Sequence, residues 1–355
     1  MHRERISDDV YVFTSGLYAQ VTASAIVTAD GVVVIDTLPF PSETRQVIEY
    51  IERRAPVKYV IYTHYHADHT YGGYLFRHAQ FIAHELCREL LITRGDAGLK
   101  LARVQNSSLA DVQLRLPDIV FTGEMTLRLG GKTFVLTHSP GHTPDGITVY
   151  IREDKILFAA DTVMPVPYVV DGDAPTMLKS LQTLKGMALE NVVQGHGEIV
   201  LRGEINETIN SSINYLNKMQ NAVVSALTAN QSRDDMLREY DIESCGKTRI
   251  ALNGLVQQLH AANLIATYDR LSTDKSKLAA AKARSAAAAL EEPAGKPKAK
   301  AKSTKKPIKA KTKATRKPIG AKAKPVKKAA KTKAKAATPS KKSTAKKPSR
   351  QKRRK

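Results

Sequence analysis

The sequence predicts an α/β protein built as an αββα sandwich, with two β-sheets packed face to face and helices outside. Three observations support this prediction. Short apolar strands alternate with amphipathic helices over the first 200 residues, the same order of elements occurs twice, and clusters of His and Asp follow several strands. A chain of 355 residues also favours more than one domain.

The expected elements follow from periodicity and turn residues. Val47, Ile48 and Ile51 share one helical face, and Ala29-Asp30-Gly31 supplies a hairpin turn. The first half is expected to contain strands at residues 10–14, 24–28, 32–36 and 57–62, with a helix at residues 42–54. The second half is expected to contain strands at residues 133–136, 147–151, 156–160 and 191–193, with a helix at residues 176–189.

One six-residue stretch, His64-Tyr65-His66-Ala67-Asp68-His69, carries most of the functional information. It places four metal-capable side chains directly after an apolar strand. Imidazole and carboxylate together favour zinc or another divalent transition metal. A surface loop that happens to be rich in His is the alternative interpretation of this stretch alone.

Side chains of the same chemical types follow later strands. His142, Asp161 and His196 each come after a short apolar run, in or beside a loop that contains Gly or Pro. If these strands and the strand before His64 belong to one sheet, all four present their polar side chains at one edge. The chain order therefore predicts a single metal centre.

The ordered ligand set, together with Asp36 and the Gly72-Gly73 pair, resembles the metallo-β-lactamase superfamily over roughly the first 200 residues. The resemblance implies the αββα fold and two divalent metal ions, with Zn²⁺ favoured and Mn or Fe accepted by the same ligands. It assigns His64, His66 and His142 to one ion, Asp68, His69 and His196 to the second, and Asp161 to both.

Such a centre implies hydrolysis. A hydroxide shared by two ions is the expected nucleophile on a carbonyl or phosphoryl centre. Asp68 is expected to accept or relay a proton. Asp36 is expected to orient the His loop as a hydrogen-bond acceptor, and an ordinary Asp at a strand-end turn is the alternative.

The residue type at position 161 narrows the range of expected substrates. By the same resemblance, antibiotic-hydrolysing branches carry Cys or Ser at this position, whereas glyoxalase II, lactonase and ribonuclease branches carry a bridging Asp. Hydrolysis of β-lactams is therefore disfavoured. Cys87 and Cys245 match no ligand position and are expected to lie in helices as small apolar groups, and they provide no disulfide framework.

Three further features stand outside the ligand pattern. Residues 84–116 look helical with a break at residues 94–98; they either cover the site or form a peripheral insertion, which is the favoured interpretation. Tyr168 either donates to a substrate oxygen or packs within its loop. His84 is expected to be structural or to support a ligand.

Residues 204–272 are expected to form a helical unit. Apolar residues recur at three- and four-residue spacing from Ile205 to Leu227, and Ser232 begins a capping box. A third helix is expected around residues 252–259, and residues 264–270 are expected to be extended. The unit resembles either a winged-helix extension or, as favoured, a cap or dimerisation element.

Residues 273–355 are expected to be a disordered basic tail. Residues 271–355 hold 31 Lys and Arg against 3 Asp and Glu, a net charge of +28, whereas residues 1–270 hold 25 against 31, a net charge of −6. The tail has no aromatic residue and resembles the tails of linker histones. Its expected partner is nucleic acid, bound through phosphates without sequence preference; a solubilising tail is the alternative.

The sequence therefore predicts a catalytic domain at residues 1–203, a helical unit at residues 204–272 and a tail at residues 273–355. Neither a secretory signal nor a membrane-spanning stretch is evident, which favours a cytoplasmic, nucleoid-associated protein. The predicted function is hydrolysis of a small ester, lactone or thioester by an enzyme that is tethered to nucleic acid. The alternative is metal-dependent cleavage of RNA or another phosphodiester.

Overall fold

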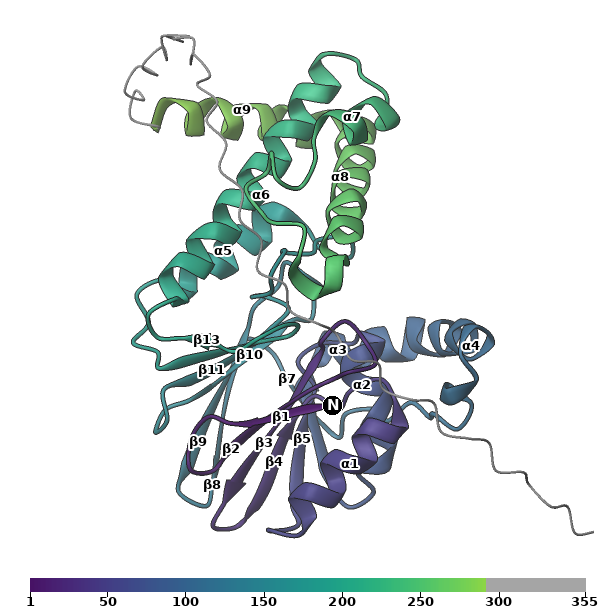
Figure 1. Ribbon diagram of the computed structural model, residues 1–355, viewed down its shortest axis with the longest axis vertical. Coiled ribbons are helices and arrows are strands. Elements are labelled where there is room, and N and C mark those ends of the chain that lie inside the picture. The colour runs from purple at the N-terminus through teal and green to yellow at the C-terminus, as the bar shows by residue number, and fades with distance from the viewer. Residues whose placement is uncertain (292–355) are drawn as a thin grey trace, which may run out of the picture. The chain divides into compact units, whose positions relative to one another are not determined.

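The computed structural model describes residues 1–291, which form two β-sheets and a set of surrounding helices. The seven-stranded sheet has the order β1-β2-β3-β4-β5-β6-β7, and the six-stranded sheet has the order β13-β12-β11-β10-β9-β8. Helices α1 and α5 lie on opposite outer sides of the pair of sheets (Figure 1). The predicted αββα sandwich is confirmed.

The strands and helices have the following bounds. The first sheet contains β1 (His2–Arg5), β2 (Val10–Thr14), β3 (Thr22–Thr28), β4 (Gly31–Ile35), β5 (Val57–Ile61), β6 (Gln80–His84) and β7 (Ile119–Phe121). The second contains β8 (Glu124–Leu129), β9 (Lys132–His138), β10 (Ile147–Ile151), β11 (Ile156–Ala160), β12 (Asn191–Gln194) and β13 (Val200–Leu201). The helical segments are α1 (Pro41–Glu52), α2 (Ala67–Thr70), η1 (Tyr71–Leu75), α3 (Glu85–Leu90), η2 (Leu91–Gly95), α4 (Asp96–Gln105), η3 (Ser107–Leu109), α5 (Ala174–Leu184), α6 (Ile205–Thr228), α7 (Arg233–Glu239), η4 (Ala251–Gly254), α8 (Val256–Thr273) and α9 (Lys275–Glu291).

Alternating apolar residues explain the layers. In β4, Val32 and Val34 belong to the core that includes Val47 and Ile51 of α1. Their neighbours Val33 and Ile35 belong to the core between the sheets, with Phe134, Leu136 and Phe158 of the second sheet. Successive side chains of a strand point to opposite faces, so one apolar run supplies both cores.

Parallel pairing brings strand ends together. β4, β5 and β6 are parallel in the first sheet, and β11 and β12 are parallel in the second. Parallel strands present their carboxyl ends at the same edge. The expectation that one sheet supplies all the site residues is wrong, because β5 belongs to the first sheet and β9, β11 and β12 to the second.

The helical unit differs from its prediction at its end. Residues 264–270, expected to be extended, lie within α8, where Leu264, Thr267 and Leu271 are buried at helical spacing. Packing on α6 overrides the strand preference of Ile265, Thr267 and Tyr268 in this run. Residues 204–291 contain no strand, so this part of the chain offers no wing.

The start of the expected tail is also helical. α9 extends from Lys275 to Glu291, where disorder was expected. Asp274 precedes this helix, and its Oδ1 accepts from the backbone N–H groups of Ser276 and Lys277 at 3.0 and 3.1 Å. Ala and Lys favour helices, and Ala281 is buried. The predictions for residues 292–355 lie outside the described residues.

None of the helices in the described part of the chain combines the length and apolar character needed to cross a lipid bilayer. The predicted cap at Ser232 is confirmed, because its side chain accepts from the Asp235 N–H. The predicted three-part division of the chain stays a prediction. Residues of β11, α5 and α6 share one apolar core.

Gly141→Ala should lower the free energy of unfolding by about 3 kcal/mol, through overpacking and an unfavourable backbone conformation. Gly141 has φ of +140°, and a Cβ there would lie 2.3 Å from the Met177 Cα in α5. Gly203→Ala is the control, since Gly203 faces open space. Denaturant titration checks both variants; equal midpoints would contradict the predicted close packing of this loop on α5.

His84 should make the fold sensitive to acid. Its Nδ1 accepts from the Leu86 N–H at 3.2 Å, and its ring stacks on His138. Burial, and then His138, lower the pKa of His84 to about 4. The unfolded chain, with a His pKa of about 6.5, therefore binds more protons than the folded chain, so stability falls as pH drops below about 6.5.

The replacement His84→Asn keeps a cap but does not titrate. In metal-free protein, denaturant midpoints at pH 7 and pH 4.5 should therefore differ less for this variant than for the wild type. An unchanged difference would show that His84 does not contribute to acid sensitivity.

Candidate metal centre

Asp36 joins the ends of β4 and β5 and holds the loop that follows β5. Its Oδ1 accepts from the Thr63 N–H at 2.8 Å, and its Oδ2 accepts from the Thr63 hydroxyl at 2.7 Å. The same Oδ2 lies 2.8 Å from the Nδ1 of His69. Asp36 has φ of +57°, a region in which Asp is enriched. Its carboxylate therefore orients the His loop, as predicted.

The seven predicted ligands meet where the two sheets share an edge, in two groups. In the first group, His64 Nε2 and His142 Nε2 lie 3.1 and 3.0 Å from His66 Nδ1. The second group places ligand atoms of its three members within 4.8 Å of one another. Its members are Asp68, His69 and His196.

The Asp161 carboxylate lies between the two groups. Its oxygens are 3.2 Å from His142 Nε2, 3.4 Å from His69 Nε2 and 3.5 Å from His196 Nε2. A Cβ on Gly195 would come within 1.8 Å of Asp161 Oδ1, so this close approach requires glycine. One carboxylate therefore contacts imidazoles of both groups.

Each of the five imidazoles has one nitrogen in the cluster and the other engaged outside it. An outer hydrogen bond sets which nitrogen carries the proton and fixes the orientation of the ring. The outer partners are the Thr63 hydroxyl for His64 (3.1 Å), the Asp171 carboxylate for His66 (3.0 Å), the Asp36 carboxylate for His69 (2.8 Å), the Tyr168 carbonyl for His142 (2.7 Å) and the Ala19 carbonyl for His196 (2.9 Å).

The cluster fits a divalent cation. His69 Nε2 and Asp161 Oδ1 are buried and have no hydrogen-bond partner among the described residues. Leaving such atoms unpaired costs free energy, which coordination of a cation would offset. Imidazole nitrogen and carboxylate oxygen are also the donors that zinc and related ions prefer.

The two groups differ in protonation. Burial and the neighbouring imidazoles lower the pKa of His64 well below its ordinary value, and burial lowers the pKa of His142 to about 4. Burial acts the same way on His69 and His196, but nearby carboxylates outweigh it. They raise the pKa of His69 well above its ordinary value and that of His196 to about 10. His64 and His142 are therefore neutral at pH 7, whereas a cation must displace protons from His69 and His196.

Tyr65, Tyr168 and Arg94 lie beside the cluster. The Tyr65 hydroxyl donates to Asp171 at 2.7 Å and accepts from Arg94 at 3.4 Å. The Tyr168 ring centroid lies 5.9 Å from that of His142. Arg94 belongs to η2, and Leu99 of α4 packs in one apolar cluster with Tyr71 and Ala67, so this segment contacts the His loop and the turn that follows it. The expected helix break at residues 94–98 is wrong, because the segment continues through a π-helical turn.

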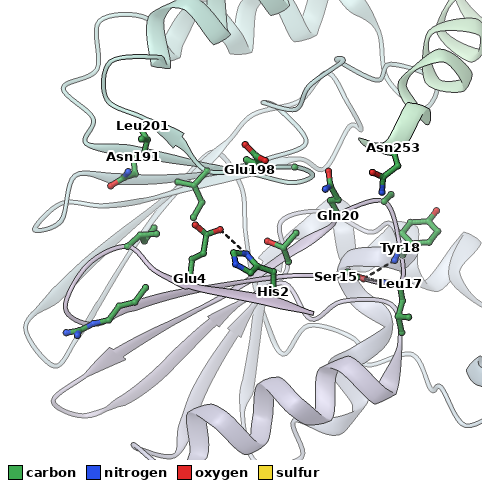
Figure 2. Close-up of a pocket in the computed structure, with 17 residues that line it drawn as sticks. His2, Glu4, Ser15, Leu17, Tyr18, Gln20, Asn191, Glu198, Leu201 and Asn253 are labelled. Carbon is green, nitrogen blue, oxygen red and sulfur yellow. Dashed lines mark hydrogen bonds and ion pairs between the residues drawn. The ribbon is translucent and has the colours of Figure 1, made fainter. Parts of the chain in front are cut away.

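A cavity of about 830 Å³ lies beside this cluster, and none of the seven predicted ligands lines it. The loop between β2 and β3 separates the two. Figure 2 shows Tyr18 and Gln20 on this loop, beside Asn253 of η4. The Ala19 carbonyl of the same loop accepts from His196, so one side of the loop faces the cluster and the other the cavity.

Sequence patterns missed Asp171, which contacts both Tyr65 and His66. It lies in an irregular loop after Val169-Val170, and no motif distinguishes it from an ordinary loop Asp. Cys87 and Cys245 are buried, free and outside the cluster, as expected. Cys87 lies in α3, but Cys245 lies in a turn and not in a helix.

Comparison with curated proteins identifies partial relatives. The chain is 30% identical over 212 residues to metallo-beta-lactamase type 2 of Pseudomonas aeruginosa, which covers 55% of this chain and 77% of that protein. It is 32% identical over 130 residues to a hydroxyacylglutathione hydrolase of Rhodopseudomonas palustris, over 36% of this chain and 43% of that protein. The chain spans only 41–57% of several other relatives that it matches.

A solved structure shares the fold over a longer stretch. A metallo-beta-lactamase family protein from Thermus thermophilus matches with a TM-score of 0.57 at 14% identity, over 76% of this chain and 95% of that chain. The family model described as the metallo-beta-lactamase superfamily matches residues 18–224, more than half of the chain. This protein therefore belongs to the metallo-beta-lactamase superfamily of metal-dependent hydrolases.

Proposed function

We propose that this protein is a dinuclear metal-dependent hydrolase of a small ester, lactone or thioester. The position of Asp161 carries the proposal. Its carboxylate contacts imidazoles from both groups, which suits a ligand shared by two ions. The alternative of a His-rich surface loop does not explain why six further ligands converge around this buried carboxylate.

The proposed ligand sets are those that the sequence predicted. His64, His66 and His142 hold one ion, Asp68, His69 and His196 hold the second, and Asp161 contacts both. Zn²⁺ suits this mixture of nitrogen and oxygen donors best, and Mn and Fe are the alternatives. Bound divalent ions supply Lewis acidity and make water more acidic.

Asp68 is the proposed proton acceptor. Its side chain is 17% exposed, compared with 5% for Asp161, so it is the more accessible of the two carboxylates. Burial alone would raise the pKa of Asp68, but His69 and His196 hold it well below its ordinary value. Asp68 therefore stays ionised at neutral pH, which is the state that a proton acceptor requires.

The distribution of charge favours a small carbonyl substrate. Lys58 lies near the start of β5 and Lys155 just before β11, at the ends of those strands away from the ligands. The edge of the site is lined by Tyr65, Tyr168 and the exposed Arg94. Of these three side chains only Arg94 is positively charged, so they offer few cationic contacts for a phosphodiester. The likeness to a hydroxyacylglutathione hydrolase supports the same substrate class.

Cleavage of RNA or another phosphodiester is the alternative function. It rests on the basic tail, which we propose as a nucleic-acid tether because of its net charge of +28 over residues 271–355. Most of that tail, residues 292–355, lies outside the described residues. The tether proposal therefore rests on composition alone.

A screen with metal-quantified full-length protein and a variant without residues 292–355 tests the proposal. The panel holds a lactone, S-lactoylglutathione, a bis-nitrophenyl phosphate diester and a structured RNA. Turnover of a carbonyl substrate should be equal with and without the tail. His66→Ala should reduce it to background, whereas His78→Ala, which removes an exposed His outside the cluster, should not. Preferential cleavage of diester or RNA would overturn the proposed substrate class.

Asp36→Ala should weaken metal affinity by about 10–100-fold, because the His69 ring loses the acceptor that orients it. Competition with a chelator measures this loss. Asp118→Ala is the matched control. The Asp118 carboxylate likewise accepts from a backbone N–H of the first sheet, that of Phe81, but it has no hydrogen bond to any of the seven proposed metal ligands. Wild-type affinity in Asp36→Ala would show that this carboxylate does not position His69.

A further inference from the structure

The loop formed by residues 167–171 contacts two histidines of the metal cluster. Its Tyr168 carbonyl accepts from His142 Nδ1 at 2.7 Å, and its Asp171 carboxylate accepts from His66 Nε2 at 3.0 Å. His142 Nδ1 and His66 Nε2 are the outer nitrogens of their rings, and the other nitrogen of each ring faces the cluster. The position of this loop therefore sets the orientation of two of the three imidazoles of the first group.

One side chain of α8 holds the same loop from the opposite side. Asn263 Oδ1 accepts from the Val169 N–H at 2.9 Å, and Asn263 Nδ2 donates to the Pro167 carbonyl at 2.7 Å. These two bonds flank Tyr168 in sequence. The carboxamide thus clamps the backbone on both sides of the carbonyl that orients His142.

Asn263 is itself held in one orientation by a buried network. Its Nδ2 also donates to the Tyr215 hydroxyl at 3.0 Å, and that hydroxyl lies 3.0 Å from His260 Nδ1. His260 Nε2 lies 3.1 Å from the Tyr240 carbonyl. If the Tyr215 hydroxyl donates to His260 Nδ1 and His260 Nε2–H donates to the Tyr240 carbonyl, every polar group in this network has a hydrogen-bond partner. Asn263 and Tyr215 are fully buried, so no water can replace these bonds.

Two weaker observations support the same connection. Arg270, also on α8, points its guanidinium at the Val169 and Val170 carbonyls at 3.5 and 3.4 Å. Val169 is fully buried in the apolar core that contains Leu264 and Leu271 of α8. α8 packs along α6, which in turn packs on α5 (Figure 1). The loop is therefore fixed by polar and apolar contacts to the helical unit.

We infer that Asn263 is a positioning residue through which the helical unit orients His142 and His66 for metal binding. The inference rests on the proposed function, since it takes these histidines to be ligands. It assigns residues 205–273 a role in the metal centre rather than in nucleic-acid binding. Loss of the carboxamide leaves the Pro167 carbonyl and the Val169 N–H unpaired, so the loop shifts and both rings lose their fixed orientation.

The test compares full-length Asn263→Ala, Arg270→Ala and Met236→Ala with the wild type. Met236 is buried in α7 within the same apolar core, and α7 packs on α6 and α8, so its truncation is the matched control for reduced stability. Arg270→Ala removes a partly exposed side chain and keeps the test valid if Asn263→Ala does not fold. Zn²⁺ affinity is measured by chelator competition, and the visible spectrum of the Co²⁺-loaded protein reports the ligand geometry.

Asn263→Ala should weaken Zn²⁺ affinity by about 10–100-fold and alter the Co²⁺ spectrum. Arg270→Ala should do the same to a smaller extent, whereas Met236→Ala should lower the melting temperature and leave affinity and spectrum unchanged. Wild-type affinity and spectrum in both loop-contact variants would overturn the inference, and so would an equal loss of affinity in Met236→Ala. A wild-type protein that binds no metal, or a His66→Ala variant that retains it, would instead overturn the metal centre itself.

Discussion

Gathering five imidazoles and two carboxylates at one largely buried point is the constraint on which the rest of this structure depends. Buried polar atoms cost free energy unless each has a partner. The fold meets this need with acceptors from three parts of the chain: Asp36 after β4, the Ala19 carbonyl between β2 and β3, and the Tyr168 carbonyl and Asp171 in the loop of residues 167–171. Two buried atoms that face the proposed cations, His69 Nε2 and Asp161 Oδ1, have no hydrogen-bond partner among the described residues.

The two-sheet architecture follows from the same constraint. One sheet edge has room for few side chains, because neighbouring strands lie about 4.8 Å apart. Two sheets that meet face to face bring the ends of β5, β9, β11 and β12 within reach of one another. The core between the sheets therefore contributes to function as well as to stability, because its thickness sets how closely His142 and His196 of the second sheet approach the His loop of the first.

The sequence predicts the αββα layers and all seven residues of the cluster, since His and Asp after apolar strands form a local pattern. The residues that orient the cluster have no such pattern. Asp171 and Asn263 are single polar residues whose partners lie 105 and 94 positions away. The extended structure expected at residues 264–270 is wrong because packing on α6 outweighs local preference. The expectation of one sheet is wrong for a similar reason, because the assignment of β5 to one sheet and of β9, β11 and β12 to the other depends on pairing between distant strands.

The loop between β2 and β3 has a mechanical consequence. Leu17 and Tyr18 at its tip are 62% and 48% exposed, while Ala19 and Gln20 have φ of +45° and +51°. This backbone is strained for residues with a side chain, and it is tied to the chain around His196 by the Thr22–Gly195 and Gly197–Gln20 hydrogen bonds. A displacement of the exposed tip would therefore also move the Ala19 carbonyl, which orients His196. The exposed tip and the orientation of His196 in the second group of ligands are coupled through one short segment of main chain.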